Sequence, residues 1–95
     1  MQNIKLVLID ENGKLLKDSE LNIVSIVKDG KLSENGQLKF IDPYGNTIFN
    51  QLQSKSLIDE VKGLLHSDQK PLIKKIISFM LSNTEPHTYF AFIGD

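Results

Sequence analysis

The hydrophobic pattern changes its period about halfway along the chain. In the first half, short segments rich in Ile, Val and Leu are separated by turn sequences, which is typical of β-strands. We expect strands over residues 4–10, 22–27, 37–41 and 47–50. For residues 22–27 a short helix is the competing prediction, because apolar and polar residues alternate poorly there.

Four turn signals separate these segments. Asn-Gly pairs at residues 12–13 and 35–36 favour type I′ turns, because both residues tolerate positive φ. An Asp-Gly pair at 29–30 is a weaker signal. The fourth signal, Asp-Pro-Tyr-Gly at 42–45, predicts a hairpin between its flanking strands, with Gly45 at positive φ.

Apolar residues of the second half recur at helical spacing and predict a first helix over residues 57–65. Either Ser54 or Ser56 is expected to cap its N-terminus. Asp59 and Glu60 are then expected near the positive end of this helix.

A second helix is predicted to begin near Pro71 and to end at Asn83. Its wide apolar face, which includes Ile76 and Met80, predicts that it supplies much of the core. The last segment, residues 88–93, is apolar on both faces, so we expect it in the interior of the sheet beside the first strand.

These elements predict an α+β fold. We expect an antiparallel sheet of about four to five strands, both helices on one face, and a final strand that returns to the sheet interior. A chain of 95 residues is expected to form a single domain, 1–95.

Composition and charge narrow the function. The chain has no cysteine, which excludes disulfides, thiolate zinc sites and cysteine nucleophiles and fits a reducing compartment. It has no arginine and a net charge of −1, so we expect no nucleic-acid partner. We see no signal peptide, and no apolar run approaches the roughly 20 residues that span a bilayer. The interpretation is a soluble, cytoplasmic protein without a membrane partner.

Catalytic and metal-binding motifs are not found in the sequence. His66 and His87 stand without cysteine or clustered carboxylates, which makes a weak metal site, so we expect no metal and no cofactor. No His-Glu-x-x-His helix, Gly-x-Ser-x-Gly turn or glycine-rich phosphate loop is present.

Side-chain amides are unusually dense around residues 46–53. One interpretation is a polar rim that binds a partner or a small ligand. The candidate residues of that rim are Asn46, Thr47, Asn50, Gln51 and Gln53. The other interpretation, which we favour, is a connector whose amides satisfy nearby backbone groups. Tyr44, at the tip of the proline turn, is either an interface anchor or a ring packed over a neighbouring strand.

Polar residues at predicted strand ends give a second candidate site. Asp42, Asn50, His87 and the terminal Asp95 are expected to serve an enzyme or ligand-binding domain if they converge at one sheet edge. We also predict a structural hydrogen bond between the Asp95 carboxylate and the amide cluster around Asn50.

The segment Asp-Pro-Tyr-Gly-Asn-Thr-Ile-Phe-Asn-Gln-Leu-Gln and the ending Phe-Ile-Gly-Asp carry a family resemblance. The chain resembles a family of small uncharacterised bacterial proteins that share a D-P-Y-G-x-T-x-F-N-x-x-Q segment and a C-terminal F-I-G-D. The resemblance covers the first strand, the proline turn, both helices and the tail, and it departs over residues 21–36. It implies a bacterial origin and a complete chain, and it implies no reaction.

Two functions are compatible with these observations. The first is a small non-catalytic protein-interaction module, such as a toxin-neutralising immunity protein, with another protein as its partner. The second is a small enzyme or ligand-binding domain at the sheet edge. A concave site that contains the strand-end polar groups would favour the second function, and a flat surface would favour the first.

Overall fold

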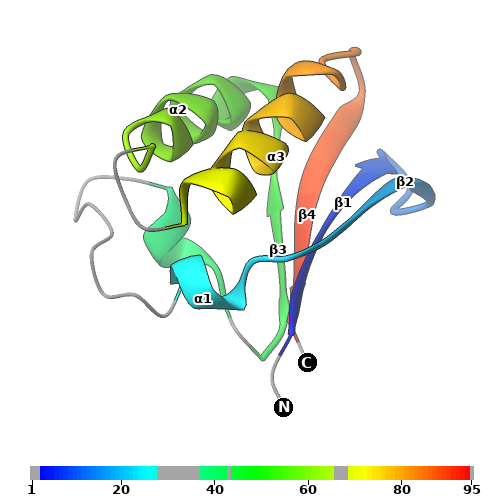
Figure 1. The fold of residues 1–95 in the computed structure, drawn as a ribbon. Helices are drawn as coiled ribbons and strands as arrows, with labels where there is room; N and C mark the ends of the chain where they lie inside the picture. Colours follow the sequence, from blue (N-terminus) through cyan, green and yellow to red (C-terminus); the bar gives the residue numbers. More distant parts are fainter. Residues whose placement is uncertain (1–2, 28–36, 43, 66–68, 95) are drawn as a thin grey trace.

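The computed structural model describes residues 3–27, 37–42, 44–65 and 69–94. In these residues a four-stranded antiparallel sheet carries two main helices on one face (Figure 1). The predicted α+β class is therefore confirmed. The predicted turns at 29–30 and 35–36 lie outside the described residues.

Eight elements follow one another in the described parts of the chain. They are β1 (Ile4–Asp10), β2 (Leu15–Asn22), α1 (Val24–Val27), the 3₁₀ helix η1 (Leu38–Phe40), β3 (Asn46–Phe49), α2 (Gln51–Lys62), α3 (Lys70–Leu81) and β4 (Thr88–Gly94). The strands lie in the order β2-β1-β4-β3. As predicted, the last strand lies inside the sheet and beside the first strand, where both of its edges are paired.

The main core lies between the sheet and the helices. Every second residue of β1 and β4 points into it, so that Leu6 is paired with Phe92 and Leu8 with Phe90. Helix α3 adds Ile73, Ile76 and Met80. Both strands are also apolar on their other face, which explains why the sequence of β4 lacks a simple alternation.

The connection between β1 and β2 is a turn of three residues, 11–13, closed by the hydrogen bond that Asp10 N donates to Lys14 O (3.0 Å). It is not the predicted two-residue type I′ turn. Gly13 alone has positive φ, at 82°, and Asn12 does not. The Asp10 carboxylate accepts hydrogen bonds from the backbone N–H groups of Asn12 (2.9 Å) and Lys14 (2.8 Å). This side chain therefore holds the wider loop, in which a single left-handed residue is enough.

Strand β2 was not predicted from the sequence, and the strand predicted over residues 22–27 is wrong. Residues Val24–Val27 form the short helix α1, which was the competing prediction. The Asn22 side chain favours this helix, because its Oδ1 accepts hydrogen bonds from the N–H groups of Ile4 (3.0 Å) and Val24 (3.1 Å). It thereby ends β2 and begins α1.

The predicted hairpin around the proline turn is also wrong. The segment expected as a strand over 37–41 contains η1, and β3 pairs with β4 instead. The carboxylate of Glu60 on α2 accepts hydrogen bonds from the N–H groups of Gln37 (2.6 Å) and Leu38 (3.1 Å), which stabilises the start of η1. Gly45 does not have the predicted positive φ.

The two main helices lie close to their predicted positions, but the first begins earlier than expected. Its N-cap is Asn50, and neither Ser54 nor Ser56 has that role. Asp59 consequently lies near the C-terminal end of α2 rather than at its positive end. Helix α3 has Pro71 in its first turn, as predicted, and it ends at Leu81, two residues before Asn83. No helix in the described part of the chain is long and apolar enough to cross a membrane.

Candidate functional site

The amide cluster between β3 and α2 mainly satisfies backbone groups, as in the interpretation that we favoured. Asn50 Oδ1 accepts a hydrogen bond from Gln53 N (2.9 Å), and Asn50 N donates to Gln53 Oε1 (3.0 Å). This reciprocal pair is a capping box at the start of α2. Gln51 Nε2 donates to the Thr88 carbonyl (2.7 Å) and hydroxyl (2.8 Å), which joins α2 to β4.

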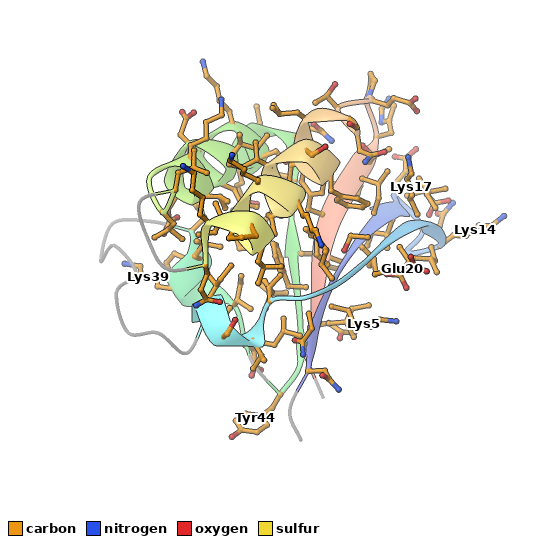
Figure 2. The ribbon with its side chains drawn as sticks, viewed as in Figure 1. Lys5, Lys14, Lys17, Glu20, Lys39 and Tyr44 are labelled. Atoms are coloured by element: carbon orange, nitrogen blue, oxygen red, sulfur yellow. The ribbon has the colours of Figure 1, made fainter. Side chains whose placement is uncertain are left out.

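The turn before β3 also uses its polar side chains locally. Asp42 Oδ1 accepts a hydrogen bond from Tyr44 N (2.9 Å), and Asp42 N donates to Thr47 Oγ1 (2.9 Å). A Cβ atom on Gly45 would stand 2.8 Å from Asp42 Oδ2, so glycine is favoured there by close approach and not by φ. Tyr44 is 74% exposed and protrudes from the end of the sheet (Figure 2).

The described residues of the second candidate site do not converge as predicted, because they lie at two ends of the sheet. Asn50 and His87 do share a shallow hollow of about 230 Å³. Its lining consists of Asn50, Gln51, Leu52, His87 and Tyr89. Asp42 precedes the opposite end of β3, where Gly45 O accepts a hydrogen bond from Gly94 N (2.8 Å).

Asp95 itself lies outside the described residues. Its neighbour Gly94 is five strand residues beyond Tyr89, or about 16 Å along β4. Asn50 follows the β3 residue that pairs with Phe90, so it lies at the far end of β4 from Gly94. Because Asp95 is outside the described residues, its predicted bond with Asn50 stays a prediction.

His87 is exposed just before β4 and lies near Glu11. Nδ1 of His87 lies 3.7 Å from Glu11 Oε2, and both side chains are more than half exposed. Such pairs contribute little to stability. In the described ranges, no group of three or more His, Asp or Glu side chains is arranged to hold a metal ion.

The sheet face opposite α2 and α3 is a larger candidate surface than the hollow beside Asn50. The strand registers place its side chains in three rows across the strands, because residues paired in an antiparallel sheet point to the same side. From β3 to β2, the first row is Asn46, Ile93, Lys5 and Asn22, the second is Ile48, Ala91, Val7 and Asp18, and the third is Tyr89, Ile9 and Leu15. We call these residues the outer face.

Apart from Ile93, the outer face is polar in its first row, and apart from Asp18 at the β2 edge it is apolar in the other two rows. Val7, Ile9 and Ala91 are buried by their neighbours and form a small cluster with Tyr89. Around them Ile48 is 54% exposed and Leu15 is 55% exposed. No described helix or strand covers this surface (Figure 1). An uncovered sheet face is usually polar, so this apolar centre calls for an explanation.

A bulge in β2 hollows the polar row of the outer face. Two extra residues of β2 lie between the pairs Lys5–Asn22 and Val7–Asp18, and Glu20 within them has φ of 62°. The resulting hollow has a volume of about 390 Å³. It is lined by Asn3, Lys5, Glu20, Leu21, Asn22 and Ile93. We call it the bulge hollow.

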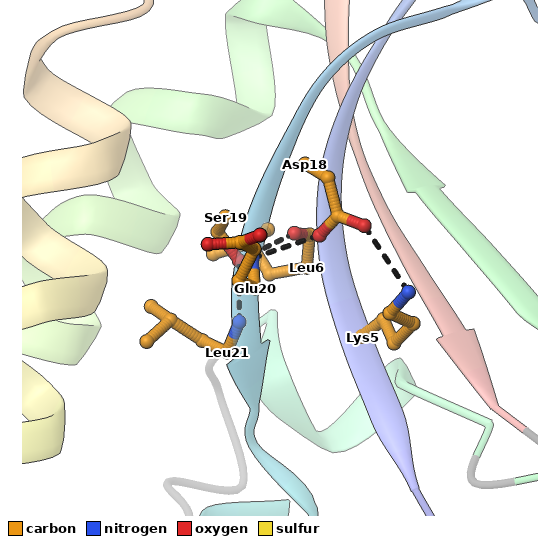
Figure 3. Close-up of polar contacts among 6 residues, drawn as sticks. All are labelled: Lys5, Leu6, Asp18, Ser19, Glu20 and Leu21. Carbon is orange, nitrogen blue, oxygen red and sulfur yellow. Dashed lines mark hydrogen bonds and ion pairs between the residues drawn. The ribbon is translucent and has the colours of Figure 1, made fainter.

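Hydrogen bonds hold the bulge in place (Figure 3). Asp18 Oδ1 accepts from Glu20 N (2.8 Å), and Asp18 Oδ2 accepts from Lys5 Nζ (3.1 Å). The Glu20 N–H and then the Lys5 ammonium lower the pKa of the Asp18 carboxyl below its ordinary value. Ser19 Oγ donates to Leu6 O (2.6 Å) and accepts from Leu21 N (3.2 Å).

The chain matches no protein-family model, and no significant match is found among curated proteins or solved structures. Of the residues predicted to bind, Asn46 lies on the outer face, and Tyr44 lies at the same end of the sheet. The residues of the outer face on β1 and β2 were missed. A signal for them exists, because the charged sequence Lys17-Asp18-Ser19-Glu20 interrupts an otherwise apolar strand region.

Proposed function

We propose that this protein is a non-catalytic protein-interaction module that binds another protein through the outer face of its sheet. The observation that carries the proposal is the exposed apolar side chains of this face, which no described helix or strand covers. Ile48 and Leu15 are each more than half exposed there, beside the buried cluster of Val7, Ile9 and Ala91. Exposed apolar side chains with polar residues around them are characteristic of protein-binding sites.

The surroundings of this surface support a protein partner over a small ligand. The apolar rows are an open sheet surface, and the bulge hollow lies only at their polar margin. Tyr44 protrudes from the end of the sheet where the polar first row lies, and tyrosine is a residue type enriched in binding hot spots. A partner with an apolar contact patch would bury Ile48 and Leu15 and leave the polar first row at the rim.

The particular role that we propose is toxin neutralisation, in which the protein occupies a site on a toxin. A 95-residue chain with a net charge of −1 is compatible with such a stoichiometric inhibitor. The role predicts that co-expression relieves the growth arrest caused by the partner. Growth arrest that persists despite a formed complex would contradict neutralisation and leave protein binding in place.

Site-specific photo-crosslinking tests the binding surface. Ile48 is replaced by p-benzoylphenylalanine, and Leu81, which is equally exposed but lies on α3, is the matched control position. In cells that express the protein, irradiation is expected to give one dominant adduct from position 48 and none from position 81. Mass spectrometry identifies the adduct, and the purified adduct protein must then bind the unmodified chain in a 1:1 complex.

Three outcomes would contradict the proposal. The first is the same set of adducts from both positions. The second is an adduct with a second copy of this chain, together with a dimer in analytical ultracentrifugation. The third is an adduct protein that does not bind after purification.

A further inference from the structure

The backbone of the bulge hollow holds one acidic residue in an unfavourable conformation. Glu20 has a left-handed φ of 62°, which is uncommon for a residue other than Gly, Asn or Asp. Such strain persists only where the surrounding structure enforces it, and it concentrates at functional positions. Here the enforcing contacts are the hydrogen bonds that Asp18 and Ser19 form within the bulge.

The charges around the hollow do not cancel. The Lys5 ammonium is paired with Asp18 at 3.1 Å, which neutralises both groups. Among the residues that the structure describes, the Glu20 carboxylate takes part in no ion pair. The charged groups at the hollow therefore leave one negative charge, on Glu20. Figure 2 shows Lys5 and Glu20 on the side of the sheet away from α2 and α3.

The hollow is apolar where Glu20 does not reach. Its volume of about 390 Å³ is within the range of small-ligand sites. Ile93 is its apolar side chain on the outer face, whereas the side chain of Leu21, another lining residue, packs against the main core. A ligand that fits this lining has an apolar stem and a cationic head. Arginine has both, and its planar guanidinium matches the two oxygens of a carboxylate.

We propose that the bulge hollow receives an arginine side chain of the partner protein, with its guanidinium on Glu20 and its stem against Ile93. The inference rests on the proposed function for its biological setting, because the arginine belongs to the protein that covers the outer face. It names the chemistry by which that partner is selected. The apolar rows give the partner contact area. The Glu20 carboxylate in the hollow requires a positive charge on the partner at that end of the face.

A simpler explanation of the bulge is protection of an edge strand. β2 is at the edge of the sheet, and bulges and charged residues on edge strands prevent pairing with other chains. Edge protection accounts for a bulge and for Lys17, but it requires neither a left-handed glutamate nor an apolar hollow beneath it. The two explanations therefore differ in whether the hollow binds a guanidinium.

A titration of the full chain, followed by ¹H–¹⁵N NMR, tests the inference without the partner. The probe is N-acetyl-arginine N-methylamide, and the neutral citrulline analogue is the matched control probe. We expect saturable shifts at the amides of Glu20, Leu21 and Asn22 with the arginine compound only. Glu20→Gln should weaken the apparent affinity about threefold to fivefold, as is typical of one exposed ion pair.

Two further variants separate binding from folding. Glu85→Gln removes an exposed carboxylate in the loop before β4 and should leave the titration unchanged. Glu20→Gly suits the left-handed backbone, so it should keep or raise the melting temperature while it weakens the response to arginine at least as much as Glu20→Gln does.

The inference is overturned if the citrulline analogue shifts the same amides equally or if Glu20→Gln or Glu20→Gly binds the arginine probe as the unmodified protein does. A stronger response to the corresponding lysine compound would overturn the assignment to arginine. None of these results bears on crosslinking at Ile48, so a failure here is distinguishable from a failure of the proposed function.

Discussion

At the scale of single residues, polar side chains in this protein mostly serve the backbone next to them. Asp10, Asp18, Asn22, Asp42 and Asn50 each accept a hydrogen bond from an N–H group a few residues further along the chain. Each interaction fixes a turn, a bulge or a helix start. Their density in the sequence is therefore a sign of local structure, and only those with unused polar groups are candidates for binding.

The helix cap gives the clearest prediction at this scale. Asn50→Ala removes the acceptor for Gln53 N and should lower the free energy of unfolding by about 1 kcal/mol. Asn46→Ala is the matched control, because Asn46 is exposed on the outer face. Urea unfolding followed by circular dichroism measures both. Equal effects of the two substitutions would contradict the assignment of Asn50 as the cap.

The bulge gives a prediction for pH dependence. The Glu20 N–H and the Lys5 ammonium lower the pKa of Asp18, so the folded state holds the ionised form more strongly than the unfolded state does. The resulting stability is present above the ordinary aspartate pKa, about pH 4, and is lost as the pH falls through the folded-state value. Asp18→Asn should therefore lose stability relative to the unmodified protein at pH 6, and less so at pH 3.

Urea melts of both proteins at the two pH values test this linkage. Asn at position 18 keeps an acceptor for the Glu20 N–H, so the comparison isolates the charge. A difference in unfolding free energy that is the same at pH 6 and pH 3 would show that the Asp18 charge does not stabilise the bulge.

At the scale of elements, α3 packs on the sheet and supplies buried side chains to the main core. Met80 is fully buried, whereas its neighbour Leu81 is 52% exposed at the end of the same helix. Met80→Ala should cost about 2–5 kcal/mol, a large part of the stability of a domain of this size. Leu81→Ala is the control and should cost much less. Chemical denaturation in which Met80→Ala proves neutral would mean that α3 is not docked as described.

Which elements the sequence predicted depends on where their hydrogen bonds are formed. Both long helices and β4 were predicted, because a sustained apolar pattern sets them. β2 was missed because it is a charged, bulged edge strand whose partner β1 is needed to define it. The sequence predicted a strand over 37–41 and missed η1. The contact that stabilises η1 comes from Glu60, which is more than 20 residues away in the chain, so the local pattern does not reveal it.

The candidate site was predictable only in part for the same reason. The amide cluster was found, and its structural role was the favoured interpretation, because capping is a local interaction. The outer face is formed by all four strands, and its rows follow from the strand order β2-β1-β4-β3. Sequence reasoning that pairs residues 37–41 with 47–50 places Ile48 beside the wrong neighbours. The sequence predicted Asn46 as a binding residue, and it did not predict Lys5, Asp18 or Glu20.

At the scale of the whole molecule, the sheet separates two kinds of apolar surface. One face is covered by the helices and forms the main core. The outer face has a buried apolar centre, exposed aliphatic side chains around it and, at one end, a hollow where the Glu20 carboxylate forms no ion pair with a described residue. Folding alone does not require the exposed part, and we attribute it to a protein partner.

The most direct measurement of this central claim is the affinity of the crosslinked partner, once purified, for two matched variants. Ile48 is 54% exposed on the outer face and Leu81 is 52% exposed on α3, so their replacement by glutamate differs mainly in location. In isothermal titration calorimetry, Ile48→Glu should weaken binding by roughly tenfold or more, as for an interface hot spot, and Leu81→Glu should leave the affinity unchanged. Equal affinities of the two variants, or a loss confined to Leu81→Glu, would contradict the outer face as the binding surface.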